Sequence, residues 1–136
     1  MTTTETKYRT ITLTDRAPVR IREDLWPIIA HGSFTYHDGT IRQQANRLCD
    51  IDIRVRQHAD GRSVVYGIYK YDTHFAHEQC EIHRVGVLLE PNADLTAAIK
   101  EIGNQLIERV NDSSMHRHVR DTVDDCIADL PPETLD

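Results

Sequence analysis

The sequence predicts an α+β fold: one antiparallel β-sheet of about four to six strands, packed on one face by two C-terminal helices, with a short N-terminal helix besides. Three observations support this prediction. Short stretches between residues 10 and 90 alternate apolar and polar side chains, which is the pattern of half-buried strands. Asp-Gly pairs at residues 38–39 and 60–61 are typical of tight hairpin turns. Beyond Pro91 the apolar residues recur every three or four positions, as they do along one face of a helix.

The N-terminal part of the chain predicts a strand, a break and a short helix. The run TITLT at residues 10–14 alternates, and the alternation resumes briefly at residues 19–21. We expect a short helix over residues 24–30, because Pro27 is tolerated near the start of a helix and Gly32 suits its end. The Thr-rich residues 1–8 are expected to be frayed.

The middle of the chain predicts most of the sheet. Residues 34–41 span the first Asp-Gly pair and predict a hairpin with Ile41 beyond its turn. The clearest strand is LCDIDIRVRQ at residues 48–57, whose inward positions are Cys49, Ile51, Ile53 and Val55. The returning stretch at residues 62–72 is apolar or aromatic on both faces, which favours a central position in the sheet. Residues 84–90 form a further expected strand, which ends before a proline.

Two helices are predicted after these strands. Asn92 or Asp94 is expected to cap the first helix, and Asn111 to end it. Ser113 or Ser114 is expected to cap the second helix, which two consecutive prolines end. The inward stripe is Leu95, Ala98, Ile99, Ile102, Leu106 and Val110 in the first helix, and Met115, Val119, Val123, Cys126, Ile127 and Leu130 in the second.

Length and composition predict a single domain over residues 1–136. The chain is 39% hydrophobic and 28% charged, which is ordinary for a globular protein. No apolar run approaches the ~20 residues that span a bilayer, and MTTTETKYRT lacks the organisation of a secretory signal, so we expect a cytoplasmic protein without membrane association. The three cysteines are an odd number at wide spacing, and we expect them to be reduced, with Cys49 and Cys126 in the core.

The net charge of −6 belongs entirely to the C-terminal part of the chain. Residues 1–93 hold 12 acids and 12 Lys and Arg, whereas residues 94–136 hold 10 acids and 4 Lys and Arg. Acidic side chains recur at three-to-four-residue spacing along the second helix, which gathers them opposite its apolar stripe. One interpretation is a solvated face that keeps the protein soluble, and the other is a surface that presents ordered negative charge to a basic groove. The candidate partner-binding residues are Asp121, Asp124, Asp125, Asp129 and Glu133.

The stretch HFAHEQCEIH places His74, His77, Cys80 and His83 three residues apart. Histidine and cysteine are zinc ligands, but structural zinc sites pair their ligands at other spacings. Neither a helix nor a strand directs all four side chains to one point, so only a tight turn could bring three of them together. A polar connector between two strands is the favoured interpretation, and a zinc site is the alternative.

Motifs of catalysis are missing from the sequence. It contains no G-x-S-x-G, G-x-x-x-x-G-K-[ST], G-x-G-x-x-G or H-E-x-x-H. Asp50 and Asp52 share one face of the clearest strand, but Arg54 and Arg56 continue that face and neutralise it. A basic and aromatic sheet face is the single candidate for binding nucleic acid, with residues Arg54, Arg56, Arg62 and Lys70 and with Tyr66, Tyr69 or Tyr71. A charged solvent face explains these residues better.

The stretches ITLTDRAPVRI, EDLWPIIA, IRVRQHADGRSVVYGIYKYD, LLEPNADLTAAIKEIG and CIADLPPETL are spread over most of the chain. Together they resemble a group of small, mostly uncharacterised proteins carried by proteobacterial prophages and other mobile elements. The resemblance transfers no catalytic motif and no site residue. It implies a context, because small acidic proteins of such elements are often inhibitors of host defence, including anti-CRISPR proteins, which act by occupying a protein surface.

We therefore expect a non-enzymatic, protein-binding accessory factor of a phage or mobile element, an anti-CRISPR-like inhibitor that acts through the acidic helical face. The expected partner is a basic or nucleic-acid-binding host protein. Two alternatives stay open: a metal-binding protein that uses the histidine and cysteine cluster, and a nucleic-acid binder that uses the sheet face. The oligomeric state stays open, and a homodimer joined through a sheet edge is one common arrangement.

Overall fold

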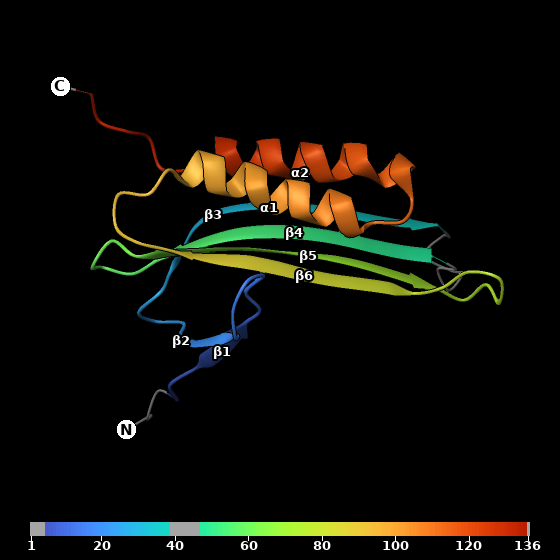
Figure 1. Ribbon diagram of the computed structural model, residues 1–136, viewed down its shortest axis with the longest axis horizontal. Coiled ribbons are helices and arrows are strands. Elements are labelled where there is room, and N and C mark those ends of the chain that lie inside the picture. The colour runs from blue at the N-terminus through green and yellow to red at the C-terminus, as the bar shows by residue number, and fades with distance from the viewer. Residues whose placement is uncertain (1–4, 39–46, 136) are drawn as a thin grey trace.

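A computed structural model describes residues 5–38 and 47–135. Within these residues the chain forms six strands, two α-helices and a short 3-10 helix (Figure 1). The strands are β1 (Tyr8–Ile11), β2 (Val19–Arg22), β3 (Ile28–Asp38), β4 (Arg47–Gln57), β5 (Ser63–Thr73) and β6 (Glu81–Leu89). The helices are α1 (Leu95–Arg109), η1 (Ser113–Met115) and α2 (His116–Ala128). The predicted α+β class is thus confirmed.

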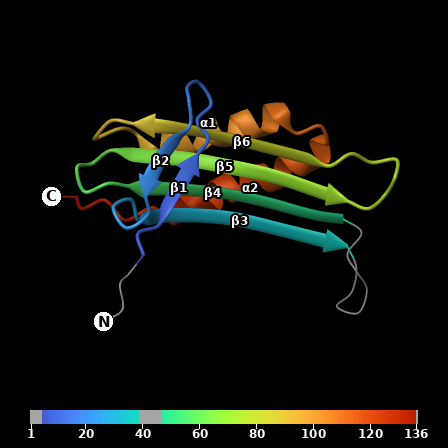
Figure 2. The same cartoon turned by 90° about the horizontal axis from the view of Figure 1, so that it is seen from below.

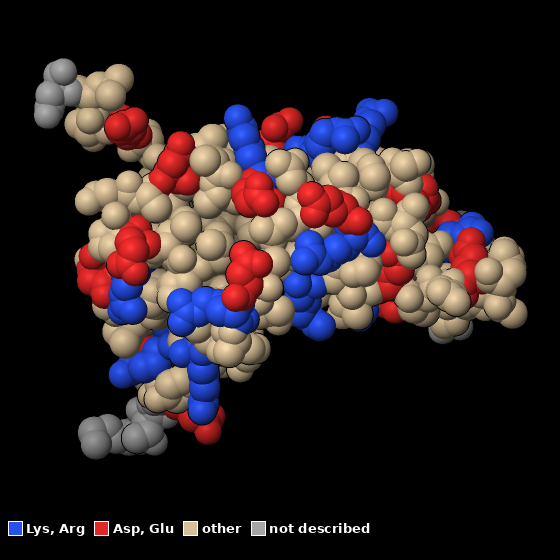
Figure 3. Space-filling model, viewed as in Figure 1, with Lys and Arg blue, Asp and Glu red and all other residues tan. Residues whose placement is uncertain are grey.

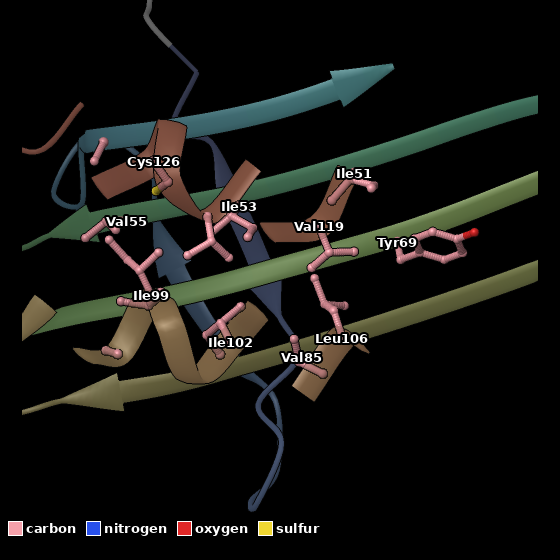
Figure 4. Close-up of a cluster of buried hydrophobic side chains, with 14 of the residues drawn as sticks. Ile51, Ile53, Val55, Tyr69, Val85, Ile99, Ile102, Leu106, Val119 and Cys126 are labelled. Atoms are coloured by element: carbon pink, nitrogen blue, oxygen red, sulfur yellow. The ribbon is translucent and has the colours of Figure 1, made fainter. Parts of the chain in front are cut away.

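Strands β3 to β6 form an antiparallel sheet in the order β3-β4-β5-β6, and α1 and α2 cover one of its faces (Figure 1). The strand predicted most clearly is β4, and its alternate side chains are buried against the helices. Figure 4 shows these side chains interleaved with those of α1 and α2. The labelled residues of this core are Ile51, Ile53, Val55, Tyr69, Val85, Ile99, Ile102, Leu106, Val119 and Cys126.

The prediction of a single sheet is wrong, because β1 and β2 form a separate two-stranded antiparallel sheet. This hairpin crosses the face of the larger sheet that the helices leave open (Figure 2). Ile11, Leu13 and Ile21 pack there with Trp26 against Val64 of β5, which is fully buried. Strand β5 is therefore covered on both faces, which confirms its central position and explains why it is apolar on both.

The short helix predicted over residues 24–30 is wrong. The N–H groups of Leu25 and Trp26 both bond to the carbonyl of Arg22, which makes one turn, and β3 then begins at Ile28. The carbonyl of Pro27 accepts a hydrogen bond from the N–H of Gln57, so the chain is already aligned with β4 at this point. The β-branched Ile28 and Ile29 suit a strand, and pairing with β4 decides the conformation.

The ends of the helices differ from the prediction by one or two residues. Asp94 caps α1 by accepting a hydrogen bond from the N–H of Ala97, as expected. The N-cap of α2 is Met115, not a serine, and it makes no side-chain capping bond, whereas Asp112 caps the preceding η1 by accepting the N–H of Ser114. Val110, not Asn111, is the C-cap of α1. None of the helices in the described residues is long and apolar enough to cross a membrane.

Of the two predicted hairpin turns, only the one between β4 and β5 lies within the described residues. Gly61 has a φ of 94°, which glycine adopts without strain, and it turns the chain between β4 and β5 as predicted. The other predicted turn residue, Gly39, and Ile41 beyond it lie outside the described residues. Tyr8, expected to be frayed, is the first residue of β1 and pairs with Arg22.

Candidate functional site

Helix α2 lies directly over the edge strand β3. Gly32 of β3 makes this possible, because a β-carbon at that position would collide with the backbone carbonyl of Thr122. Farther along the strand, the ring of His118 stacks on Phe34, with centroids 4.2 Å apart and planes 12° apart. The orientation of α2 is therefore fixed by its fit to β3 as well as by the apolar core.

Asp121, Asp125 and Asp129 form one row along α2, because residues four apart stand above one another on a helix. All three are exposed. The carboxylate of Asp129 accepts a hydrogen bond of 2.8 Å from the backbone N–H of His31 in β3, which places the row on the flank of α2 that overhangs β3. We call these three residues the acidic row.

The other two predicted partner-binding residues lie outside the acidic row. Asp124 is exposed on the neighbouring solvent side of α2, one residue from Asp125. Glu133 is exposed in the segment that follows the helix. In the view of Figure 3, where α1 and β6 lie in front, basic and acidic side chains are intermixed. The structure thus groups three of the five predicted residues, sets Asp124 beside them and places Glu133 beyond the end of the helix.

The charges on α2 are arranged against its macrodipole. Arg117 and Arg120 lie in its N-terminal half, Asp121 lies near its middle, and Asp124 and Asp125 lie in its C-terminal half, with no acid in the first turn and no base in the last. Negative side chains near a helix C-terminus destabilise it. Arg117 and Asp121 approach to 4.0 Å, but both side chains are largely exposed, so this pair contributes little. This distribution of charge along α2 therefore does not stabilise the helix.

The histidine and cysteine stretch connects β5 and β6, as the favoured interpretation predicted. His74, His77 and Cys80 are exposed in the loop, whereas His83 lies in β6 and pairs with Glu81 at 3.0 Å. Within residues 5–38 and 47–135, no three His, Cys, Asp or Glu side chains are grouped to hold a metal ion. Zinc binding by these four residues stays a prediction, which elemental analysis of protein purified without chelators tests.

Glu78, at the centre of the same loop, was missed by the sequence analysis. Its carboxylate accepts hydrogen bonds from Arg47 at 2.8 Å, from the Thr73 hydroxyl at 2.7 Å and from the Tyr71 hydroxyl at 3.0 Å. These bonds, chiefly the one from Arg47, lower the pKa of Glu78 to about 2. The Arg47 guanidinium also lies over the ring of Phe75, 4.4 Å from its centroid. The loop is therefore built around an ion pair.

The residues proposed for binding nucleic acid do not share one surface. Tyr66 lies on the open face of the sheet, whereas Tyr69 is buried on the helix face. Arg56 is also buried and donates hydrogen bonds to the carbonyl of Trp26 and to the Tyr66 hydroxyl. Tyr71 bonds to Glu78, and Arg62 lies over the Trp26 ring. The structure thus separates the aromatic side chains that would have to stack with bases.

The open face holds a groove of about 540 Å³ beside β1. Its charged lining combines both signs: Arg9, Arg54, Arg84, Asp50 and Asp52. Asp52 accepts hydrogen bonds of 2.8 Å from Arg54 and pairs at 2.9 Å with His31, so its charge is already matched. Three arginines face two aspartates in this lining, and Arg9 is paired with Glu23 at 2.7 Å, so the groove offers little net positive charge to a phosphate backbone.

A smaller hollow of about 340 Å³ lies between the β5–β6 loop and η1. Three carboxylates line it, and each already accepts a hydrogen bond from the protein. Glu78 bonds to Arg47, Glu81 to the N–H of Asn111, and Asp112 to Ser114. The hydrogen bonds of these three carboxylates therefore stabilise the local structure.

Comparisons of the chain with protein-family models, with curated proteins and with solved structures found no match.

Proposed function

We propose that this protein is a non-enzymatic binding protein that engages a basic surface of a partner protein through the acidic row of α2, with Asp124 beside it. The observation that carries the proposal is the arrangement of charge on α2. Asp124 and Asp125 lie near the C-terminal end of the helix, where they oppose its macrodipole, and both remain exposed. Residues that break a local rule of stability without a structural gain are typical of functional surfaces.

The contacts of the acidic row support the same proposal. Asp129 is held by the N–H of His31, whereas Asp121 has one weak ion pair and the Asp125 carboxylate has no partner among the described residues. A row with one fixed end and exposed carboxylates along it presents negative charge at a defined position. Such complementarity accelerates encounter with a basic partner and fixes its orientation. That the partner belongs to a host-defence system stays a prediction from the resemblance.

Charge reversal tests this function. The variant D121K/D124K/D125K is compared with the wild type in affinity purification from the native host, followed by measurement of the affinity for each enriched protein. The matched control is E90K/E101K/E108K, which changes the net charge equally but alters exposed residues on and before α1. We expect the first variant to lose its partner and the control to retain it.

The affinity should also fall steeply as salt is added, because exposed charges are screened within about 8 Å at physiological ionic strength. Circular dichroism and the unfolding midpoint establish that both variants fold. Undiminished binding by the folded D121K/D124K/D125K variant would contradict the proposed function.

A further inference from the structure

The outer edge of β3 carries unpaired backbone groups. In an antiparallel pair, successive residues point their N–H and C=O alternately toward the neighbouring strand and away from it. The N–H of His31 points away from β4, since it bonds to Asp129. Ser33, Thr35 and His37 follow at alternate positions and therefore point the same way. In the described part of the chain, no partner is found for their backbone groups.

The opposite edge of the sheet is β6, and its backbone groups follow the same alternation. Unlike the β3 edge, it is covered by another part of the chain. Across the sheet, His31 lies in register with Arg54, Tyr66 and Gly86. The backbone groups of Gly86 do point outward, where Thr14 donates its N–H to the Gly86 carbonyl at 2.8 Å and accepts the Gly86 N–H on its hydroxyl at 3.1 Å. Thr14 thus covers the middle of the β6 edge.

No such cover protects β3 between residues 33 and 37 within the described structure. This stretch reads SFTYH and contains no Lys, Arg or Pro, the residues that commonly block an edge strand. Ser33, Thr35, Tyr36 and His37 are all exposed. Figure 2 shows β3 at the margin of the sheet, with the β1–β2 hairpin lying across the sheet and not along that margin.

The acidic row overhangs this same edge. Asp129 bonds to β3 at His31, and His118 lies on Phe34, so the stretch of α2 between them runs above the strand. Asp121 and Asp125 lie in that stretch. A strand added beside β3 would bring its helix-side side chains below these two carboxylates. The backbone edge and the charge above it therefore belong to one surface.

We propose that an extended, basic segment of a partner protein adds to β3 as an antiparallel strand. This inference rests on the proposed function and specifies how the acidic row is used. The backbone of the segment pairs with Ser33, Thr35 and His37, which supplies affinity without regard to sequence. Its Lys or Arg side chains on the helix side reach Asp121 and Asp125, which supplies selectivity for basic segments.

A second copy of the chain fits this edge less well than a basic segment. β3 reads IIAHGSFTYHD and carries neither Lys nor Arg. Pairing of β3 with itself would therefore leave the carboxylates above the edge without a positive partner, and each copy would bring a further acidic row. The charge of the surface selects a basic occupant.

The test uses the full-length protein and the capped peptide KTKTKTKTK. In an antiparallel pair, residues opposite each other share a face, so threonines opposite Ser33, Thr35 and His37 place lysines on the helix side. We expect the amides of these three residues to exchange at least about tenfold more slowly when the peptide is bound. The peptide ETETETETE should not bind.

N-methylated peptides separate backbone pairing from charge attraction. Methylation of the threonine nitrogens removes the donors that face β3 and should weaken binding at least about tenfold, whereas methylation of the lysine nitrogens should be tolerated. Equal binding of both methylated peptides, without protection of the β3 amides, would overturn strand addition. The proposed function would still stand if D121K/D125K then lost the peptide.

Three further outcomes count against the inference or against the function on which it rests. Failure of KTKTKTKTK to bind the folded wild-type protein overturns it. Protection of the Ser33, Thr35 and His37 amides that rises with protein concentration, in the absence of peptide, assigns the edge to a second copy. If D121K/D125K binds the lysine peptide as tightly as the wild type, the acidic row itself is not the binding surface, and the proposed function fails.

Discussion

The carboxylate of Asp129 accepts a hydrogen bond of 2.8 Å from the backbone N–H of His31, and this contact ties the C-terminus of α2 to the edge of β3. It satisfies one outward-facing N–H of the edge strand and leaves the next ones open. It also fixes where the acidic row stands with respect to the sheet. The helix surface and the strand edge are therefore one feature of the molecule.

Replacing Asp129 by alanine should free the His31 N–H. We expect faster amide exchange at His31 and a loss of stability of about 0.5–1.5 kcal/mol, since the bond lies at the surface. Native-state hydrogen exchange measures both quantities. The control is Asp124→Ala on the same helix. If the two variants exchange alike at His31, the contact is absent in solution.

Replacing Gly32 by alanine should push α2 away from β3. The added methyl group would collide with the backbone carbonyl of Thr122, which a side-chain rotation cannot relieve. We expect a loss of about 1–3 kcal/mol in the free energy of unfolding, measured by urea denaturation. Ser33→Ala, at the next and exposed position, should change stability by less than about 0.5 kcal/mol. Equal stability of the two variants would show that α2 does not approach β3 this closely.

The three thiols should differ sharply in reactivity. Burial raises the pKa of Cys49 and of Cys126 to about 11, and both side chains are fully buried, whereas Cys80 is exposed. In the native protein a thiol-specific chromogenic disulfide reagent should modify Cys80 quickly and the other two only as the protein unfolds. Cys80→Ser should remove the fast phase. A fast phase that persists in this variant would place a second thiol at the surface.

The ion pair of Glu78 should make the β5–β6 loop sensitive to acid. The pKa of Glu78 is lowered from its ordinary 4.5 to about 2, so the stability that it contributes is complete above pH 4.5 and is lost as the pH falls from 4.5 toward 2. We therefore expect Glu78→Gln to lower the unfolding midpoint near neutral pH and to match the wild type near pH 2. A difference that stays constant over this range would refute the pairing with Arg47.

Much of the fold follows from periodicity in the sequence. Alternation predicts β4, an apolar and aromatic stretch on both faces predicts β5, and the three-to-four-residue spacing predicts both helices, because these patterns reflect the local geometry of the backbone. Periodicity does not show which strands pair. The pattern therefore predicts one sheet, although the β1–β2 hairpin forms a second sheet that packs across the open face of the first. It also predicts a helix over residues 24–30, although pairing with β4 makes β3 begin at Ile28.

The candidate site was predictable only in part, for the same reason. Helical spacing was enough to group Asp121, Asp125 and Asp129. The open edge depends on which side of β3 bonds to β4, and the contact with His31 joins residues 98 positions apart. Likewise, Glu78 lies 31 residues from Arg47, so its role in the loop left no local signal. Contacts of this kind become visible only in three dimensions.

A charge swap tests the central claim most directly, namely that the acidic row selects a basic strand at the β3 edge. Affinities of KTKTKTKTK and ETETETETE are measured by calorimetry for the wild type and for the variant D121K/D125K. The account predicts that the wild type binds the lysine peptide, that the variant binds the glutamate peptide, and that both peptides protect the amide of Thr35. A variant that still prefers the lysine peptide, or that binds both peptides alike, would contradict it.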